Sequence, residues 1–270
     1  GEGPSEVEGF PVVRAAGVPC PVYPELTLSA RLPGMLPMLR AWRADVVHLA
    51  GPALLGLQGM RVARIMGIPA AGHFQTNLAL YVRHFGAPWL EPLTWKYLVA
   101  IHNRCNANYA PTAATAADLR RHGMRDVRVL GRGVDARSFH PRFRSAGLRS
   151  SWGVEDDTPV LLYAGRLSPE KNLDRLADLV GALPSCKMVI VGDGPYRPAL
   201  EARLGHTAHF TGHLRGEELA RAYASADLFT FPSLTETFGQ VLQEAMASGL
   251  PILAMRAGGT PEIVEDGCTG

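Results

Sequence analysis

Short apolar runs alternate with helix-forming segments along most of the chain, and this alternation restricts the folds that it can adopt. The runs that predict strands lie at 45–49, 68–72, 107–110, 127–130, 159–164, 187–191, 208–211, 227–231 and 251–255. Alternating strands and helices favour parallel sheets whose faces are covered by helices. The sequence therefore predicts an α/β protein with two doubly wound, parallel-sheet domains that face a cleft.

Capping residues and glycines mark several predicted helix boundaries. Thr112 is expected to cap a helix that runs to His122, and Asn172 is expected to cap a helix at 173–183. The other predicted helices cover 52–66, 78–85, 89–104, 196–204, 216–224 and the segment that Gly249 ends.

The domain boundary is predicted in an irregular segment at 132–141, which divides the chain into domains at 1–140 and 141–270. Residues 1–40 are rich in proline, and we expect little regular structure there.

The composition excludes several classes of protein. A hydrophobic content of 47% supports a folded core, and a net charge of +2 does not favour a nucleic-acid partner. The four cysteines form no C-x-x-C pair, and no apolar run reaches the length of a membrane span. A cytoplasmic protein is the default expectation.

Arginine is concentrated between Arg120 and Arg149, a segment with nine arginines and no lysine. Such a strip could face phosphates or the anionic face of a membrane, which would make the protein peripheral. It could equally form solvated helix faces.

Two glutamates stand out in the segment 231–249, which reads as the end of a strand, a loop and a helix. If the chain between Glu236 and Glu244 were helical, they would lie about 12 Å apart along the axis. The paired carboxylates of glycosidases lie about 5–10 Å apart, so this spacing argues against such a pair. It suits two anchors for one long ligand, with a helix N-terminus between them for an anionic group.

Three further loops follow predicted strands. Gly165-Arg166 and Lys171 could bind phosphate through a guanidinium and an ammonium group. Gly192-Asp-Gly194 forms a glycine turn, and His213-Leu214 could border a flat base. Each loop alone could be a surface turn, but in a doubly wound sheet all of them fall on the carboxyl edge, where ligands bind.

The histidines are harder to assign. His73 follows a strand of the first half, where it would face the cleft. His206, His209 and His213 are close in sequence, but their spacing matches no zinc pattern, and we predict no metal site.

Together, G-R-L-S-P-E-K-N from Gly165, the G-D-G-P turn, F-T-G from Phe210, and the two glutamates followed by E-A-M-A-S-G-L-P resemble family 4 retaining glycosyltransferases. The resemblance implies the GT-B fold, with two Rossmann-like domains. Y-P-E-L, H-F-Q-T-N and R-G-V-D resemble the branch that transfers mannosyl, sulfoquinovosyl or glucosyl groups to form glycolipids.

The resemblance implies a role for each site residue. Arg166 and Lys171 would hold the diphosphate of a nucleotide sugar such as GDP-mannose or a UDP-hexose, with Gly165, Gly192 and Gly194 allowing close approach. Glu236, Phe238 and Gly239 would contact the sugar and phosphate, and Glu244 would bind the ribose. His213 and Leu214 would border the base, and His73 would approach the sugar from the acceptor domain. No further cofactor is implied.

The family pattern also includes a first strand with a glycine-rich loop, and C-terminal helices that cross back to the first domain. Neither is found here, so we expect an internal fragment with little transfer activity of its own. Two alternatives remain open: a GT-B nucleotide-sugar epimerase, and a non-catalytic two-domain α/β ligand-binding protein.

Overall fold

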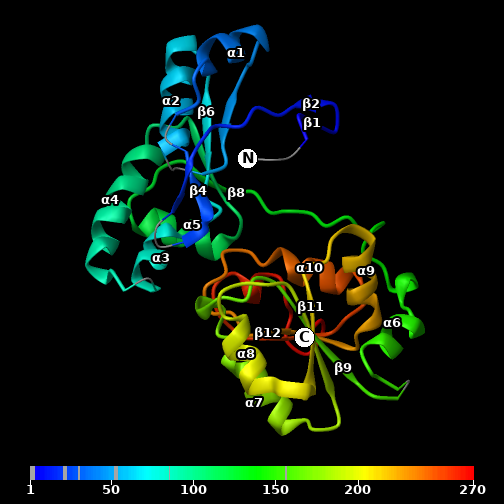
Figure 1. The fold of residues 1–270 in the computed structure, drawn as a ribbon. Coiled ribbons are helices and arrows are strands. Elements are labelled where there is room, and N and C mark those ends of the chain that lie inside the picture. The colour runs from blue at the N-terminus through cyan, green and yellow to red at the C-terminus, as the bar shows by residue number, and fades with distance from the viewer. Residues whose placement is uncertain (1–3, 21–22, 30, 52–53, 85, 156) are drawn as a thin grey trace. The chain divides into compact units, whose positions relative to one another are not determined.

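The computed structural model describes residues 4–20, 23–29, 31–51, 54–84, 86–155 and 157–270. The chain divides into two compact units, Gly1–Leu130 and Gly131–Gly270, each built around a parallel sheet (Figure 1). The bridge at 131–140 packs with the second unit. The Phe139 ring meets the edge of Tyr223 at 5.6 Å, and the Gly133 carbonyl accepts a hydrogen bond from Gln240.

The sheet of the first unit has four parallel strands in the order β5-β6-β7-β8. The strands are β5 (Val47–Leu49), β6 (Ala70–His73), β7 (Ala107–Ala110) and β8 (Val127–Val129). The helices between and beside them are α2 (Leu54–Met66), α3 (Leu78–His84), α4 (Glu91–His102) and α5 (Ala113–Arg121). The fully buried side chains of Phe74, Leu98 and Leu119 form the centre of its main core.

The first 45 residues contain more regular structure than the sequence predicts. They form two antiparallel strand pairs and a helix: β1 (Glu6–Val7), β2 (Phe10–Pro11), β3 (Val18–Cys20), β4 (Tyr23–Leu28) and α1 (Met35–Ala41). The prediction was wrong because a strand in a two-stranded pair has one free edge, where proline is tolerated, as at Pro11 and Pro19. Pro37 lies in the first turn of α1, where its missing N–H costs little.

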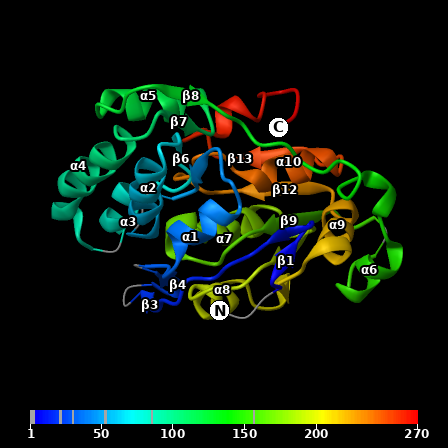
Figure 2. The ribbon, with the colours of Figure 1, turned by 90° about the horizontal axis from the view of Figure 1, so that it is seen from above.

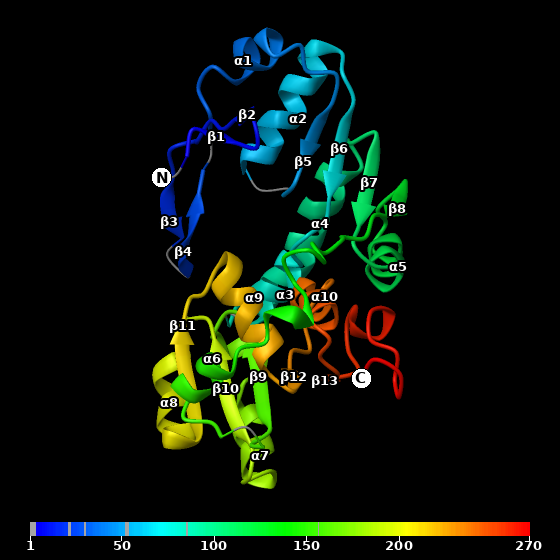
Figure 3. The same ribbon diagram turned by 90° about the vertical axis from the view of Figure 1, so that its right-hand side faces the viewer.

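The sheet of the second unit has five parallel strands in the order β11-β10-β9-β12-β13 (Figure 3). The strands are β9 (Val160–Ala164), β10 (Lys187–Val191), β11 (Ala208–Gly212), β12 (Leu228–Phe231) and β13 (Ile252–Ala254). The chain proceeds outward from β9 to β11 and then returns to place β12 on the other side of β9. The strand order therefore reverses between β9 and β12, which is the kind of point where α/β sheets bind ligands.

Helices cover both faces of this sheet (Figure 2). They are α6 (Ala146–Ser151), α7 (Asp174–Ala182), α8 (Arg197–Leu204), α9 (Gly216–Ser225) and α10 (Gln240–Ala247). Because side chains alternate along a strand, Leu161 and Leu162 of β9 enter different cores. Leu161 packs with α7 and α8, and Leu162 packs with α9 and α10.

The structure confirms one predicted helix cap and corrects another. The Thr112 side chain accepts a hydrogen bond from the Thr115 amide and caps α5. Asn172 does not cap α7, because it adopts the left-handed conformation with φ of +57° and its amide donates to the Pro232 carbonyl at 3.2 Å. Helix α6, which the sequence analysis missed, begins after Ser145.

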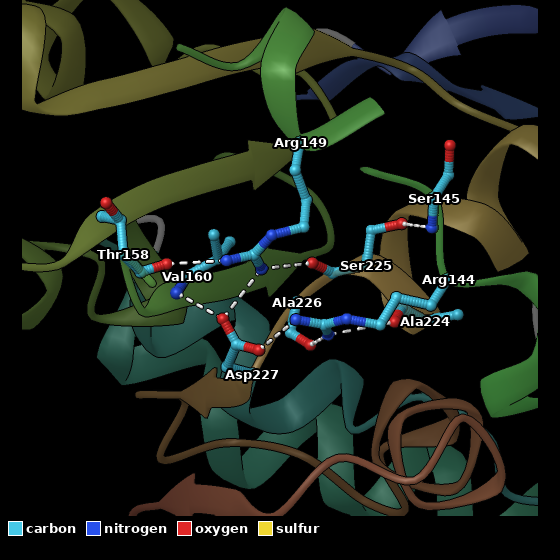
Figure 4. A network of polar contacts seen from close by, with 9 residues as sticks. All are labelled: Arg144, Ser145, Arg149, Thr158, Val160, Ala224, Ser225, Ala226 and Asp227. Carbon is cyan, nitrogen blue, oxygen red and sulfur yellow. Dashed lines mark hydrogen bonds and ion pairs between the residues drawn. The ribbon is translucent and has the colours of Figure 1, made fainter. Parts of the chain in front are cut away.

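A network of ion pairs and hydrogen bonds anchors α6 at the amino end of the central strands (Figure 4). The Asp227 carboxylate accepts hydrogen bonds from Arg144 at 2.7 Å, from Arg149 at 2.9 Å and from the Val160 amide at 2.8 Å. The Arg149 guanidinium is buried and also donates to the carbonyls of Ser225 and Thr158. Arg144 and Arg149 of the arginine-rich segment thus have structural partners within the second unit.

We expect Asp227→Asn to lower the free energy of unfolding of the second unit by about 2–3 kcal/mol. The substitution leaves the buried Arg149 guanidinium without its carboxylate partner, although the Asp227 side chain is 34% exposed. Urea unfolding measures the change, with Asp178→Asn in the exposed Arg175 pair as the matched control. Equal stability of the two variants would contradict a structural role for the network.

Lowering the pH should remove the stabilisation that the Asp227 carboxylate gives to the second unit. Burial alone would raise the pKa of Asp227, but the hydrogen bonds from Arg149, Val160 and Arg144 outweigh it, and the pKa is lowered. A carboxylate with a lowered pKa stabilises the fold fully above its unfolded pKa of about 4, and the contribution is lost as pH falls through the folded value. We expect the stability of Asp227→Asn to depend less on pH below about 4 than that of the parent chain.

Candidate functional site

Four loops of the second unit leave the carboxyl edge of its sheet. They follow β9, β10, β11 and β12 and lead to α7, α8, α9 and α10, respectively. Because all five strands are parallel, these loops lie along one edge. The loops after β9 and β12 flank the point at which the strand order reverses, so a ligand crevice is expected between them.

An ion pair joins these two loops. Lys171 ends the short 3-10 turn Pro169–Lys171 after β9, and its ammonium group donates to the carboxylate of Glu236 in the loop after β12. The two side chains keep 17% and 21% of their exposure, so both still reach the surface. The structure thus brings together two residues that the sequence analysis selected from loops 65 positions apart.

Three glycines fix the neighbouring loops by direct backbone contact. The Gly165 amide donates to the Val191 carbonyl, and the Gly192 amide donates to the Gly212 carbonyl at 2.8 Å. A Cβ atom at Gly192 would lie 1.9 Å from the Gly165 carbonyl oxygen, and one at Gly194 would lie 2.3 Å from that of Leu167. Gly192 and Gly194 also have positive φ values, so both positions require glycine.

Side chains that the sequence analysis did not select support the loop after β9. The Tyr163 hydroxyl donates to the Arg166 carbonyl at 2.9 Å, and the Ser168 hydroxyl donates to the buried Glu170 carboxylate at 2.6 Å. Burial raises the pKa of Tyr163, and the negative charges of Glu236 and Glu170 raise it further. Burial lowers the pKa of Arg166, and Glu170 opposes this change.

A glycine pair also holds the backbone of Glu236. The Gly259 amide donates to the Glu236 carbonyl at 3.1 Å, and a Cβ atom at Gly258 would lie 2.4 Å from the same oxygen. Gly258 has a φ of +59°, which fits the tight turn. The sequence indicates this contact only through the doublet Gly258-Gly259, which predicts a turn but does not show that the turn packs against Glu236.

Glu244 lies on α10 and is oriented from a neighbouring helix. Its carboxylate accepts a hydrogen bond from the hydroxyl of the buried Tyr223 on α9 at 2.9 Å. Burial raises the pKa of Glu244, and the hydrogen bond from Tyr223 opposes this change only in part. Tyr223 could not be predicted from the sequence, because a tyrosine on the apolar face of a helix gives no sign of the partner of its hydroxyl group.

Helix α10 begins later than the sequence analysis assumed. Its first residue is Gln240, so the segment from Glu236 to Gly239 is not helical, and the spacing of about 12 Å expected for a continuous helix does not apply. Gly239 precedes the helix in the left-handed conformation, and Phe238 is buried beside it. The first turn of α10 carries no acidic residue, so its positive end is available to an anion.

The loop after β11 lies beside the glycine turn after β10. The pKa of Asp193 is lowered mainly by hydrogen bonds from the Gly194 amide and Arg197, with a smaller effect of His213. His213 is exposed, whereas Leu214 packs partly buried against the core. Among the described residues no group of three or more histidine, cysteine, aspartate or glutamate side chains could hold a metal ion.

His73 belongs to the first unit and ends strand β6. Its ring is buried, stacks on His48 with a centroid distance of 5.5 Å, and lies 3.4 Å from the Gln75 amide nitrogen. His73 thus belongs to a histidine stack in the first unit, whereas the other residues predicted for the site lie in the second unit, where Lys171 and Glu236 are in contact.

Family models match both halves of the chain. One described as Glycosyltransferase Family 4 matches residues 1–138, and one described as Glycosyl transferases group 1 matches residues 146–270. The chain belongs to the family 4 glycosyltransferases, and its two parallel-sheet units have the GT-B fold. The family and fold class predicted from the sequence are both confirmed.

Two relatives are similar over nearly the whole chain. A GDP-mannose-dependent alpha-mannosyltransferase of Corynebacterium glutamicum is 39% identical over 262 residues, which are 97% of this chain and 63% of the relative. The sulfoquinovosyl transferase SQD2 of Arabidopsis thaliana is 35% identical over 276 residues, which are 99% of this chain and 54% of the relative. The chain thus spans less than two thirds of the length of either relative.

A solved structure supports the fold independently. The crystal structure of Anabaena HepE in complex with UDP-glucose has a TM-score of 0.72 and 23% sequence identity to this chain, covering 91% of this chain and 70% of HepE.

The contact between Gly192 and Gly165 leads to a prediction. We expect Gly192→Ala to lower the free energy of unfolding by more than about 2 kcal/mol, because a Cβ atom 1.9 Å from a carbonyl oxygen forces the loops apart. Gly181→Ala in helix α7 is the matched control, since nothing lies within 4 Å of its Cβ, and it should be neutral or stabilising by up to about 1 kcal/mol. Urea unfolding of both variants measures the difference, and equal values would contradict the close packing.

Proposed function

We propose that the protein is a retaining glycosyltransferase that transfers a hexosyl group from a nucleotide diphosphate sugar to an acceptor hydroxyl. The observation that carries the proposal is the Lys171–Glu236 pair, which lies at the reversal point of the sheet. We assign its cation to phosphate and its carboxylate to sugar hydroxyls. The mannosyltransferase and sulfoquinovosyl transferase names of the relatives support the same class of reaction.

The diphosphate is assigned to three positive groups. Arg166 offers a planar fork of donors for phosphate oxygens, and Lys171 offers a mobile point charge. The start of α10 after Gly239 adds backbone amides and the positive end of the helix dipole. Fixed positive groups of this kind stabilise the charge that develops on a leaving diphosphate. Gly165, Gly192 and Gly194 leave room for the backbone to approach it.

The rest of the donor is assigned to the flanking residues. Glu236 binds the hydroxyls of the sugar, and Phe238 and Gly239 contact the sugar and the phosphate. Glu244, oriented by Tyr223, accepts hydrogen bonds from the ribose hydroxyls, and its partial burial strengthens hydrogen bonds to it. His213 and Leu214 border the base.

Transfer with retention is assigned to attack on the face of the sugar from which the diphosphate leaves, with a donor phosphate oxygen accepting the proton of the acceptor hydroxyl. This is the route favoured for the family that the motifs resemble. His73 is assigned to the acceptor domain, as a residue that approaches the donor sugar. Its imidazole can donate or accept a hydrogen bond depending on its tautomer.

The relatives also guide the finer assignments. One relative is named for GDP-mannose, so GDP-mannose is a donor to test, and the resemblance of the motifs adds UDP-hexoses. We assign a lipid as the acceptor and a peripheral position on a membrane face to the protein. Within the part of the chain that the structure describes, no helix is long and apolar enough to cross a bilayer.

Calorimetry with GDP and UDP, and with GDP-mannose and UDP-glucose, tests the assignment of the donor site. We expect Lys171→Met to weaken binding of the preferred nucleotide diphosphate by at least about 10-fold, because it removes a charge-assisted contact. Glu236→Gln should weaken binding of the nucleotide sugar more than that of the free nucleotide. Lys187→Met is the control, since Lys187 begins β10 at the opposite edge of the sheet. Binding of free hexose with no response to nucleotides would contradict the proposal.

Tyr223→Phe tests how Glu244 is oriented. Loss of the hydroxyl removes the interaction that lowers the pKa of Glu244, so this pKa should rise further. Because the ribose contact needs the carboxylate, nucleotide affinity should fall by about 10-fold at neutral pH, and it should begin to fall at a higher pH as the solution is acidified.

The control for this variant is Tyr196→Phe, which removes another tyrosine hydroxyl that donates to a carboxylate, 2.7 Å from Asp174. Nucleotide calorimetry between pH 5 and 8 measures both variants. An unchanged pH dependence of nucleotide affinity in Tyr223→Phe would contradict a role of Tyr223 in orienting Glu244.

A further inference from the structure

Helix α4 and the turn before it carry large apolar side chains on the face that points to solvent. Trp89, Leu93 and Tyr97 are 76%, 62% and 37% exposed. Their spacing of four residues places them along one side of the helix, and the exposed Ala100 continues the row. We call this row the α4 outer face.

The core of the first unit does not account for this row, because it uses the other side of the same helix. Leu98 and Ile101 are buried, and Trp95 stacks on Phe74 with a centroid distance of 6.2 Å. Helix α4 is therefore apolar on two sides, which is typical of a helix that is covered on both. An exposed apolar face of this kind marks an interaction surface.

The charges beside the row are positive. Lys96 on the helix and Arg104 in the turn that follows it are exposed on the same side as Leu93 and Tyr97. The Arg104 guanidinium also donates to the Ala100 carbonyl, which holds its charge beside the row. The only acidic residue between positions 88 and 104 is Glu91, which is half-buried and lies 3.5 Å from the Arg83 guanidinium. The α4 outer face thus combines aromatic and aliphatic side chains with two cations that have no acidic neighbour on the helix.

We propose that the α4 outer face docks on an anionic lipid bilayer, with the helix lying in the plane of the interface. Tryptophan and tyrosine favour the boundary between headgroups and acyl chains, and the long side chains of Lys96 and Arg104 can reach the phosphates. A cationic helix with such a face binds membranes through buried apolar area and attraction to anionic lipids together.

A second copy of the chain fits this face less well. In a two-fold dimer the same surface is used on both sides, so Lys96 and Arg104 of one copy would face a patch of the same sign. Like charges brought together in this way oppose association, whereas anionic headgroups complement them. The charge of the face therefore favours the bilayer.

Docking on a bilayer rests on the lipid acceptor of the proposed function. Vesicle binding is measured without a nucleotide sugar, so that failure to bind vesicles and failure to bind the sugar donor are separate results. Sedimentation with large unilamellar vesicles of phosphatidylcholine and phosphatidylglycerol in a 7:3 ratio is compared with vesicles of phosphatidylcholine alone. The chain should partition onto the anionic vesicles, and 0.5 M sodium chloride should weaken the binding.

Two sets of variants locate the contact. The double substitution Trp89→Ser with Leu93→Ser should lower the partition coefficient by at least 10-fold. Lys96→Gln with Arg104→Gln should lower it by about fivefold for each cation removed. The control is Ile65→Ser on α2, a side chain that is also 62% exposed, which should bind as the parent chain does. Circular dichroism and thermal unfolding confirm that each variant is folded.

Three results would overturn the inference. The first is a parent chain that does not bind anionic vesicles. The second is a charge variant that binds as tightly as the parent. The third is a parent dimer in light scattering that Leu93→Ser converts to a monomer, which would show that a second copy covers the face.

Discussion

The carboxylate of Asp227 fixes the two strands on which the candidate donor site depends. Asp227 lies directly before β12, and it accepts a hydrogen bond from the Val160 amide that begins β9. The two strands then run parallel, with Leu228 beside Leu161 and Phe229 beside Leu162, and Thr230 donates to the Leu162 carbonyl. At their other ends the same strands present Lys171 and Glu236. The pairing of these two side chains at one edge thus depends on a register that is set at the opposite edge.

The cation and the carboxylate at this edge neutralise each other. A cation held in this way is already oriented and partly desolvated, so less side-chain freedom would be lost on binding the phosphate that we propose for it. The support beneath the pair consists of the hydrogen bond from Tyr163 to the Arg166 carbonyl, the hydrogen bond from Ser168 to Glu170, and the Gly258-Gly259 turn. Such supporting contacts keep a site in its binding geometry.

The sequence was most informative where local patterns and chain order suffice. The alternation of strands and helices gave both parallel sheets, and the loops with Gly165, Gly192 and Glu236 were expected at the carboxyl edge where they lie. Contacts between distant segments could not be predicted in this way. Nothing local shows that the Tyr223 hydroxyl meets Glu244, that Asn172 bonds to Pro232, or that Arg149 is buried against Asp227. The antiparallel pairs before residue 30 were missed because proline was read as excluding strands, without allowing for free edges.

The contacts of Gly192 and Gly194 limit how a site of this kind can be changed. Since the backbones of these loops touch with no room for a methyl group, the end of the site that we propose for the diphosphate is a fixed frame that substitution cannot reshape. Under the proposed assignment, variation in sugar preference comes from the segment between Pro232 and Gly239, where Leu234 is exposed and Thr235 and Thr237 are half-buried. An effort to change the preference for the donor sugar should therefore randomise these three side chains and leave the glycine loops unchanged.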